Sequence, residues 1–327
     1  MRRRLSEAGL ALLLVLALAG CAPAEREQQL TGDLAAHDPA IVVGQDGDPW
    51  FVYSTGGTQA DGAIQVRRSD DGVQWDYAGV VWKERPAWIG DSIRGVGPLW
   101  APELIEHEGV WYLYYAASTF GSNHSAIGLA TNTTLDPADP DYEWVDKGPV
   151  QESKTSDDFN AIDPGIVVDK DGTPWMAFGS FWSGIRMVEL EWPSGMRADS
   201  TSEPLRLADR GVPPNAVEAP TIVPHNGDYY LFVSWDNCCQ SVNSTYKIVV
   251  GRSETVAGPY LDRDGIPLLN GGGTVLLSTD GDRIGPGGES ASNGYLAFHY
   301  YDGAASGAPR LAISRIDWDA DGWPVIR

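Results

Sequence analysis

One pattern recurs along the chain: a short apolar segment containing a proline, then a turn with glycine, then a strongly aromatic segment. The aromatic segments have the composition of β-strands, and the turns contain Asp-Gly, Glu-Gly or Asn-Gly pairs. A unit that recurs in this way is a supersecondary structure stacked on copies of itself. The copies begin at residues 37–43, 100–105, 162–168, 218–223 and, in the most degenerate form, near 285–287.

The number of copies predicts the fold. Each copy contains roughly four strand-like segments, and propeller blades are four-stranded sheets. Residues 36–327 are therefore predicted to form an all-β, five-bladed β-propeller whose sheets stand around a central channel. A β-sandwich or jelly roll is the second alternative, but neither yields five equivalent segments. We find no amphipathic helix pattern in this region.

Three acidic residues occupy what looks like the same place in their copies: Asp38, Asp163 and Glu218. Trp100 takes that place in the second copy. In a closed ring the equivalent positions all point at one axis, so the three carboxyl groups are expected to meet there. The sequence therefore predicts an active site on the axis. Glu103 lies three residues beyond Trp100 and is expected to be structural.

The N-terminus has the features of an export signal. Three arginines precede an apolar run at residues 10–18, and small residues lead to Cys21. This segment resembles a bacterial lipobox, so residues 1–20 are predicted to be removed, Cys21 to be lipidated and residues 21–35 to form a tether. The alternative is an ordinary signal peptide that happens to contain a cysteine. The protein is expected to be secreted and anchored to the outer face of a bacterial membrane.

Charge and cysteine content narrow the choice of partners. A formal net charge of −22 makes the chain a poor partner for nucleic acid or for an anionic membrane surface. A neutral polymer is a better substrate, although solubility alone also explains the charge. Nothing in the sequence predicts more than a monomer.

Besides Cys21, only Cys238 and Cys239 are present, and such neighbours form a vicinal disulfide or stay reduced.

An ordered set of motifs resembles the family 43 glycoside hydrolases, and within them most closely the endo-1,5-α-L-arabinanases. The motifs are at residues 37–39, 99–103, 160–164, 178–185, 217–220, 238–247 and 298–302. Each motif is weak alone, but the set covers about residues 36–327 in the right order. The resemblance implies a five-bladed propeller and inverting cleavage of an α-1,5-linked arabinofuranose backbone.

The same resemblance implies roles for the acids. Asp38 would be the general base, Glu218 the general acid, and Asp163 the residue that raises the pKa of the acid and holds it in place. His299 matches a histidine that binds a calcium-type ion, with waters, in the central channel; packing is its alternative role. The family usually has a histidine after Gly-Pro-Gly, whereas residues 288–290 here are Gly-Glu-Ser.

Flat aromatic and apolar surfaces suit furanose rings, and polar groups nearby would fix their orientation. The side chains expected to contact the sugar are His37, Trp100, Phe120, Asn160, Ser180, Trp182 and Cys239. Trp100 could instead plug the channel, and the cysteine pair could simply pack its loop.

Two further classes of function stay open. One is another activity on the same scaffold: an exo-acting arabinanase, an α-L-arabinofuranosidase or a β-xylosidase. The other is a surface glycan-binding lipoprotein without catalysis. The three acids argue against the second class, because binding does not require a charged base beneath the sugar, whereas the altered segment at residues 288–290 argues for it.

Overall fold

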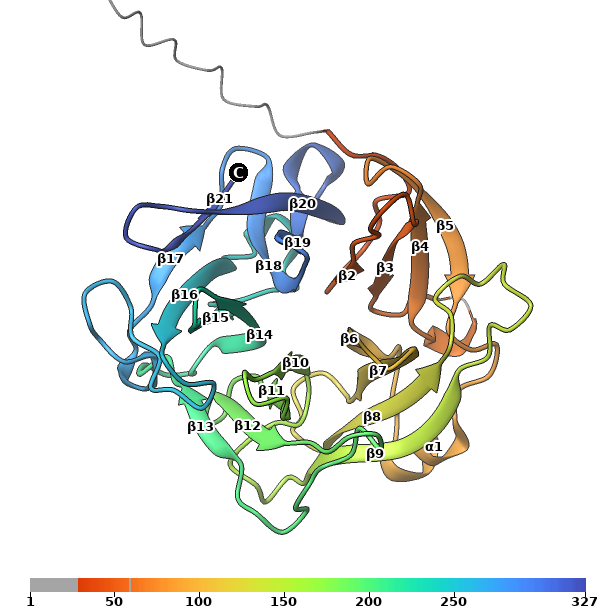
Figure 1. Cartoon of the computed structure of the whole chain (residues 1–327), viewed down its shortest axis with the longest axis horizontal. Helices are drawn as coiled ribbons and strands as arrows, with labels where there is room; N and C mark the ends of the chain where they lie inside the picture. The colour runs from red at the N-terminus through yellow and green to blue at the C-terminus, as the bar shows by residue number, and fades with distance from the viewer. Residues whose placement is uncertain (1–28, 59) are drawn as a thin grey trace, which may run out of the picture.

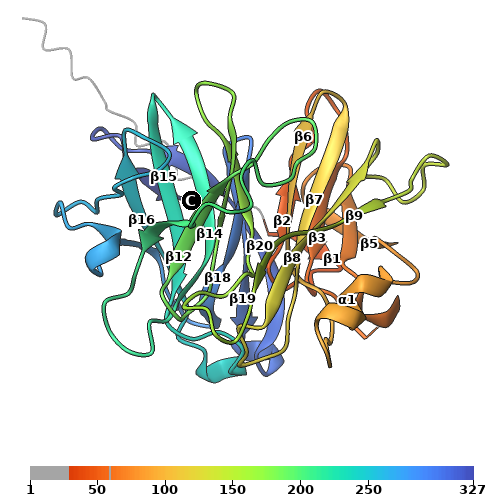
Figure 2. The same ribbon diagram turned by 90° about the horizontal axis from the view of Figure 1, so that it is seen from below.

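Five antiparallel sheets stand around a central axis, as the repeat predicts (Figure 1). A computed structural model describes residues 29–58 and 60–327. The predicted signal and Cys21 lie outside these residues. Viewed from the side, strands of the blades run along the axis (Figure 2).

Each blade is a meander in which consecutive strands pair. The first blade comprises β2 (Ala40–Val42), β3 (Trp50–Ser54), β4 (Gln65–Ser69) and β5 (Gln74–Val80), and the second β6 (Trp100–His107), β7 (Val110–Ala117), β8 (Ser125–Asn132) and β9 (Val145–Ser153). The third comprises β10 (Gly165–Val168), β11 (Pro174–Phe178), β12 (Ile185–Glu189) and β13 (Leu205–Ala208). The fourth comprises β14 (Val217–His225), β15 (Asp228–Trp235), β16 (Lys247–Ser253) and β17 (Thr274–Leu277), and the fifth β18 (Arg283–Ser292), β19 (Tyr295–Asp302), β20 (Ala308–Trp318) and β21 (Pro324–Ile326). The first strand of every blade is innermost (Figure 1).

The aromatic strands are apolar on both faces because each one packs against two neighbouring blades. In β7, Leu113 and Tyr115 belong to a core cluster shared with the first blade. The alternate residues Tyr112 and Tyr114 belong to a cluster shared with the third blade. Side chains of a strand alternate between its faces, so one segment supplies both layers of core. This is why the strands read as continuous aromatic runs rather than as an alternation of polar and apolar residues.

The ring is closed by the segment that precedes the first blade. β1 (Thr31–Gly32) pairs in parallel with β5, as a fifth strand on the outer edge of that sheet. The N–H of Leu311 in the last blade donates to the carbonyl of Leu34 at 2.8 Å. The predicted boundary between tether and propeller at residue 35 is therefore corrected, because residues 31–34 join the first blade to the fifth.

Helical structure is minor in the described residues. The helix α1 (Ala87–Ser92) and the 3-10 turns η1 (Ala60–Gly62), η2 (Ser241–Asn243), η3 (Leu268–Asn270) and η4 (Gly303–Ala305) lie in connections. No helix of the described part of the chain has the length and hydropathy needed to cross a membrane.

Candidate active site

Two successive positions of the repeat face the axis at different depths. The residues before the repeated proline all have left-handed backbones and line a small cavity in the channel: Asp38 (φ 48), Ala101 (φ 39), Asp163 (φ 56) and Ala219 (φ 54). The residues one position earlier line a large cleft above it: His37, Trp100, Ile162 and Glu218. The expectation that the three acids and Trp100 share one position is therefore wrong by one residue for Glu218 and for Trp100. Asp38 and Asp163 line both spaces, whereas Glu218 lines the cleft alone.

Asp38 is held as a charged carboxylate by three neighbours. Its Oδ2 accepts hydrogen bonds from Thr55 Oγ1 at 2.7 Å and from His37 Nδ1 at 2.8 Å. Its own N–H donates to His299 Nδ1 at 3.1 Å. Burial alone would raise the pKa of Asp38, but the His37 charge and hydrogen bond, together with the hydrogen bond from Thr55, hold that pKa well below its ordinary value. Asp38 is therefore an ionised group facing the cleft, as a general base must be.

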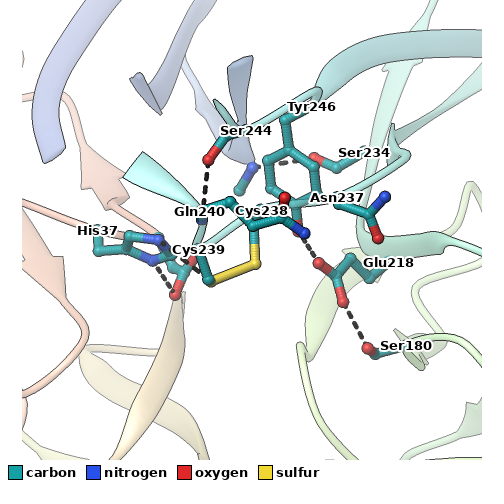
Figure 3. Close-up of a disulfide and its surroundings, with 12 residues drawn as sticks. His37, Ser180, Glu218, Ser234, Asn237, Cys238, Cys239, Gln240, Ser244 and Tyr246 are labelled. Atoms are coloured by element: carbon teal, nitrogen blue, oxygen red, sulfur yellow. Dashed lines mark hydrogen bonds and ion pairs between the residues drawn. A yellow bond between two sulfur atoms is a disulfide. The ribbon is translucent and has the colours of Figure 1, made fainter. Parts of the chain in front are cut away.

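Glu218 has the opposite character. It is buried at the start of β14, where its Oε2 accepts a hydrogen bond from Ser180 Oγ at 2.5 Å and its Oε1 one from the Tyr246 hydroxyl (Figure 3). Burial raises the pKa of Glu218 to about 7, and the charge of Asp38 adds to this, while the hydrogen bond from Ser180 opposes it. Glu218 therefore holds a proton up to neutral pH and can act as a general acid.

Asp163 lies beside the acid through the backbone. Its Oδ2 accepts a hydrogen bond from the N–H of Ala219, the residue that follows Glu218, at 3.2 Å. Burial raises the pKa of Asp163 well above its ordinary value, and the charges of Glu218 and Asp38 raise it further. Like charges disfavour each other's ionisation, so Asp163 and Glu218 together retain a proton beside the cleft. The role predicted for Asp163, to raise the pKa of the acid and hold it in place, stays a prediction.

The cleft has a volume of about 1120 Å³ and an aromatic rim. Phe120 is 85% exposed and Trp182 39% exposed, and both lie on the cleft. Every side chain predicted to contact sugar lines this cleft: His37, Trp100, Phe120, Asn160, Ser180, Trp182 and Cys239. Asn160 is buried in its wall and accepts a hydrogen bond from Ser125 Oγ at 2.7 Å.

The two neighbouring cysteines are joined as a vicinal disulfide on the same cleft. Figure 3 shows this bridge with His37 on one side and Glu218 on the other. The N–H of Cys239 donates to the Tyr301 hydroxyl at 2.7 Å, and Tyr301 is hydrogen-bonded to His37 Nε2 at 2.8 Å. The loop after β15 is thus connected to the surroundings of Asp38.

The small channel cavity beneath the acids has a volume of about 20 Å³. Two further carboxyl groups line it. Glu103 is buried and accepts hydrogen bonds from the N–H of Leu104 and from Ser290 Oγ. Glu289 is buried as well; its Oε2 accepts from Ser234 Oγ at 2.7 Å, while no group in the described chain pairs with its Oε1. Burial raises the pKa of Glu103 to about 7 and that of Glu289 to about 8.

Several contact residues were missed by sequence reasoning. Thr55 lies outside every motif, and no local pattern distinguishes it from other strand and loop residues. Tyr246 and Tyr301 fall within the motifs at residues 238–247 and 298–302, but nothing in those motifs singled them out as contacts of the acids. Glu289 carried a signal, because it falls in the segment where the family's histidine is replaced. The structure brings its carboxyl into the channel that the first strand of each blade surrounds.

His299 is fully buried behind Asp38. Its ring stacks on that of His37 with centroids 3.7 Å apart, and its Nε2 has no hydrogen-bond partner among the described residues. Burial lowers the pKa of His299 well below its ordinary value, so the ring is neutral. Because Nδ1 accepts the N–H of Asp38, the remaining ring proton lies on Nε2.

A charged carboxylate and a protonated carboxyl on one aromatic cleft are the pair of groups that a glycoside hydrolase requires. Comparison with known proteins agrees with this class. The chain matches the family described as "Glycosyl hydrolases family 43" over residues 30–324, and it belongs to that family.

Similar proteins include enzymes with two modes of action. The chain is 40% identical to the extracellular endo-α-(1→5)-L-arabinanase 1 of Bacillus subtilis over 99% of this chain and 97% of that protein. It is also 40% identical to the extracellular exo-α-(1→5)-L-arabinofuranosidase of Cellvibrio japonicus, over 89% and 86% of the two chains. Among solved structures, a Cellvibrio cellulosa α-L-arabinanase complexed with arabinohexaose superimposes with a TM-score of 0.82 at 39% identity, covering 90% of this chain and 96% of that one.

Proposed function

We propose that this protein is an inverting arabinanase that cleaves internal α-1,5 bonds of arabinan. The observation that carries the proposal is the pair of carboxyl groups in opposite protonation states on one cleft. Relatives named as arabinanases supply the substrate, and they share about two fifths of the sequence over nearly the whole chain. The endo mode is supported by the relative named as an endo-arabinanase, which aligns with 99% of this chain.

In the proposed reaction, Asp38 takes a proton from a water molecule, whose oxygen attacks the anomeric carbon. Glu218 gives its proton to the leaving oxygen as the glycosidic bond breaks. The water attacks from the face opposite the leaving group, so the configuration inverts; the two carboxyl groups are expected to be roughly 6.5–9.5 Å apart. His37 and Thr55 keep the base charged and oriented, and Ser180 and Tyr246 orient the acid.

The test is chromatography of the products from debranched linear arabinan, with xylan as the control polymer. A ladder of arabino-oligosaccharides is expected, and no product from xylan. Arabinose as the sole product would replace the endo mode with an exo mode. Xylose release would assign the site to a β-xylosidase, and binding of arabinan without any product would make the protein a glycan-binding lipoprotein.

We also propose a calcium-type cation in the channel, held through Glu289. Calcium prefers oxygen ligands, and Glu289 Oε1 is a buried carboxylate oxygen without a partner in the described chain, on a cavity that also touches Glu103 and Asp163. Water would complete the coordination. When bound, the ion would supply positive charge and ordered water near the acids. His299 could contact the ion only through a water molecule, because Nε2 of His299 carries a proton.

Calorimetric titration of chelator-treated protein with calcium chloride tests the cation. One site is expected, and Glu289→Gln should weaken binding by at least about tenfold. Glu84→Gln, at an exposed position, is the matched control and should bind as the wild type does. Equal binding by the two variants would remove Glu289 from the site.

The proposed location is outside the cell, with an anchor through Cys21. Two relatives are named as extracellular, which supports secretion. The anchor rests on the lipobox-like sequence alone. Mass spectrometry of the N-terminal peptide from a bacterial host would detect a diacylglyceryl group on Cys21, and an unmodified thiol would leave only the secreted form. We propose a monomer.

A further inference from the structure

The Cys238–Cys239 disulfide lies in a part of the molecule where it can do little for global stability. A disulfide stabilises a fold mainly by closing a loop in the unfolded chain, and a bridge between adjacent residues closes almost none. The bridge lies instead on the cleft that holds Asp38 and Glu218 (Figure 3). Its effect is therefore expected to be local and to concern the site.

A chain of hydrogen bonds runs from the disulfide to the general base. The N–H of Cys239 donates to Tyr301 Oη at 2.7 Å, and Tyr301 Oη is 2.8 Å from His37 Nε2. On the other side of the ring, His37 Nδ1 is 2.8 Å from Asp38 Oδ2. The sulfur of Cys239 is 3.9 Å from His37 Nε2, so the bridge also closes one side of the imidazole. Three successive hydrogen bonds thus link the Cys239 amide to Asp38.

The backbone of Cys239 is in a conformation that a free cysteine would tend to leave. Its φ is +64°, in the left-handed region that is unfavourable for residues with a Cβ. The bond to Cys238 ties its side chain to the neighbouring residue. Once the bond is broken, the residue can return to negative φ, which turns its N–H away from Tyr301.

Hydrogen bonds at the base of the loop that carries the bridge hold this loop together independently of the disulfide. The carbonyl of Asn237 accepts the N–H of Thr245 at 2.8 Å, and Thr245 Oγ1 accepts the N–H of Asn237 at 3.2 Å. The Ser244 hydroxyl accepts the N–H of Gln240 at 3.0 Å (Figure 3). Loss of the bridge is therefore expected to release Cys239 and not the whole loop.

We propose that the Cys238–Cys239 disulfide is a redox-sensitive positioning element that holds the general base through Tyr301 and His37. An external dithiol would reduce it by thiol–disulfide exchange: two protein thiols form and the dithiol becomes a cyclic disulfide, so two electrons and two protons are transferred. The reduced enzyme has a less well oriented base. The inference rests on the proposed role of Asp38.

A second role for the bridge predicts a different kinetic result. If the disulfide only provides an apolar surface for the sugar, its reduction weakens substrate binding, which raises KM and leaves kcat unchanged. If it positions the base, kcat falls, because orientation matters most in the transition state. The division between kcat and KM therefore separates the two roles.

The experiment compares arabinan hydrolysis by the full chain before and after treatment with dithiothreitol, with the gain of two titratable thiols as proof of reduction. We expect kcat to fall about tenfold and KM to change by less than about twofold. The variant Cys238→Ser/Cys239→Ser should have the kcat of the reduced enzyme and no response to the dithiol. Unchanged kcat in both the reduced enzyme and this variant would overturn the proposal.

The variant Tyr301→Phe tests the route of the effect. It keeps the ring and removes the hydroxyl, so kcat should already be low and reduction should lower it no further. A tenfold response that persists in Tyr301→Phe would show that the bridge acts by another route and would overturn the proposal. Circular dichroism and the unfolding midpoint check that all forms are folded.

A readout without substrate separates this inference from the proposed function. Nuclear magnetic resonance of the ring nitrogens, with His37 assigned by its loss in His37→Gln, should show a changed His37 signal on reduction. An oxidised enzyme that cleaves no glycan would contradict the proposed function alone if the His37 signal still responds. An unchanged His37 signal after complete reduction would overturn the positioning role whether or not arabinan is cleaved.

Discussion

At the residue scale, Asp38 and Glu218 are carboxyl groups that different hydrogen-bond and charge partners hold in opposite protonation states. Burial raises the pKa of both, but only Asp38 has an imidazole partner at 2.8 Å together with a hydroxyl donor. The charge thus stabilised on Asp38 helps to keep Glu218 protonated, since like charges repel. The division of roles between base and acid therefore depends on His37 and Thr55 as much as on the acids themselves.

Replacement of the base should abolish most of the activity without unfolding the protein. For Asp38→Asn we expect kcat on arabinan to fall about 10²–10⁴-fold, the range that a general base supplies. The measurement is steady-state hydrolysis together with a thermal unfolding curve. Asp48→Asn, in an exposed turn, is the control and should keep the wild-type rate. A wild-type rate in Asp38→Asn would exclude this residue from the mechanism.

The pH dependence should report the acid. Glu218 must be protonated to act, and burial raises its pKa to about 7, so kcat/KM should fall tenfold per pH unit above this value. The hydrogen bond from Ser180 lowers that pKa, and Ser180→Ala should therefore move the basic limb to higher pH. Measurement of kcat/KM from pH 5 to 9 locates the basic limb of the pH profile. A shift to lower pH would mean that Ser180 does not favour the ionised acid.

At the scale of elements, the acids lie at the start of the first strand of a blade or just before it, and close approach within the ring constrains the sequence there. Gly288 in β18 has φ +62°, and a Cβ on it would lie 2.5 Å from Asp38 Oδ1 and 2.8 Å from His299 Nδ1. The glycine is needed for backbone conformation and for space. The segment that departs from the family's pattern is therefore packed directly against the base.

Gly288→Ala should damage activity more than stability alone explains. We expect the free energy of unfolding to fall by about 1–3 kcal/mol, the usual range for overpacking, and kcat to fall at least about tenfold as Asp38 is displaced. Gly281→Ala is the matched control, because φ is +55° and a Cβ there meets no described atom within 4 Å. Gly281→Ala should lower the free energy of unfolding by about 1 kcal/mol and leave kcat unchanged. Equal kcat in the two variants would contradict the contact with Asp38.

At the scale of the whole molecule, closure of the ring buries carboxyl groups from different blades in one channel. Glu103, Glu218 and Glu289 have pKa values raised to about 7, 7 and 8 from an ordinary value of 4.5. At these three groups the folded state thus binds more protons than the unfolded state between about pH 4.5 and 8. Stability consequently falls as pH rises through this window. The pKa of Asp38 is shifted in the opposite direction, below its ordinary value. The contribution of Asp38 to the stability of the folded state is therefore fully present throughout the same pH window.

The midpoint of thermal unfolding should therefore be lower at pH 8 than at pH 5, with chelator present at both. Glu289→Gln keeps a neutral side chain at all pH values, so the decrease should be smaller in this variant. Differential scanning calorimetry at matched ionic strength is the measurement. A midpoint that rises toward pH 8, or an equal decrease in the variant, would show that Glu289 does not carry the raised pKa.

Much of the fold could be predicted because the strands and turns of the repeat are specified by short stretches of consecutive residues. Turn pairs such as Asp46-Gly47 and aromatic runs such as residues 110–117 specify strands and their connections without knowledge of distant residues. The exception was the segment at residues 31–34, whose pairing partners Gln74 and Trp75 and whose contact with Leu311 lie elsewhere in the chain. A short edge strand has no pattern of its own, so the predicted tether extended too far.

The sequence by itself determined the five blades, the three acids and the aromatic residues of the cleft, because repetition and residue type are local properties. The one-residue offset between Asp163 and Glu218, counted from the proline of each copy, is present in the sequence, but tertiary structure decided which space each acid lines. It also decided the protonation states, since burial and partners such as Thr55 and Tyr246 come from other blades or strands. The link from the cysteine pair to Asp38 was decided in the same way, by side chains that meet only when the ring closes.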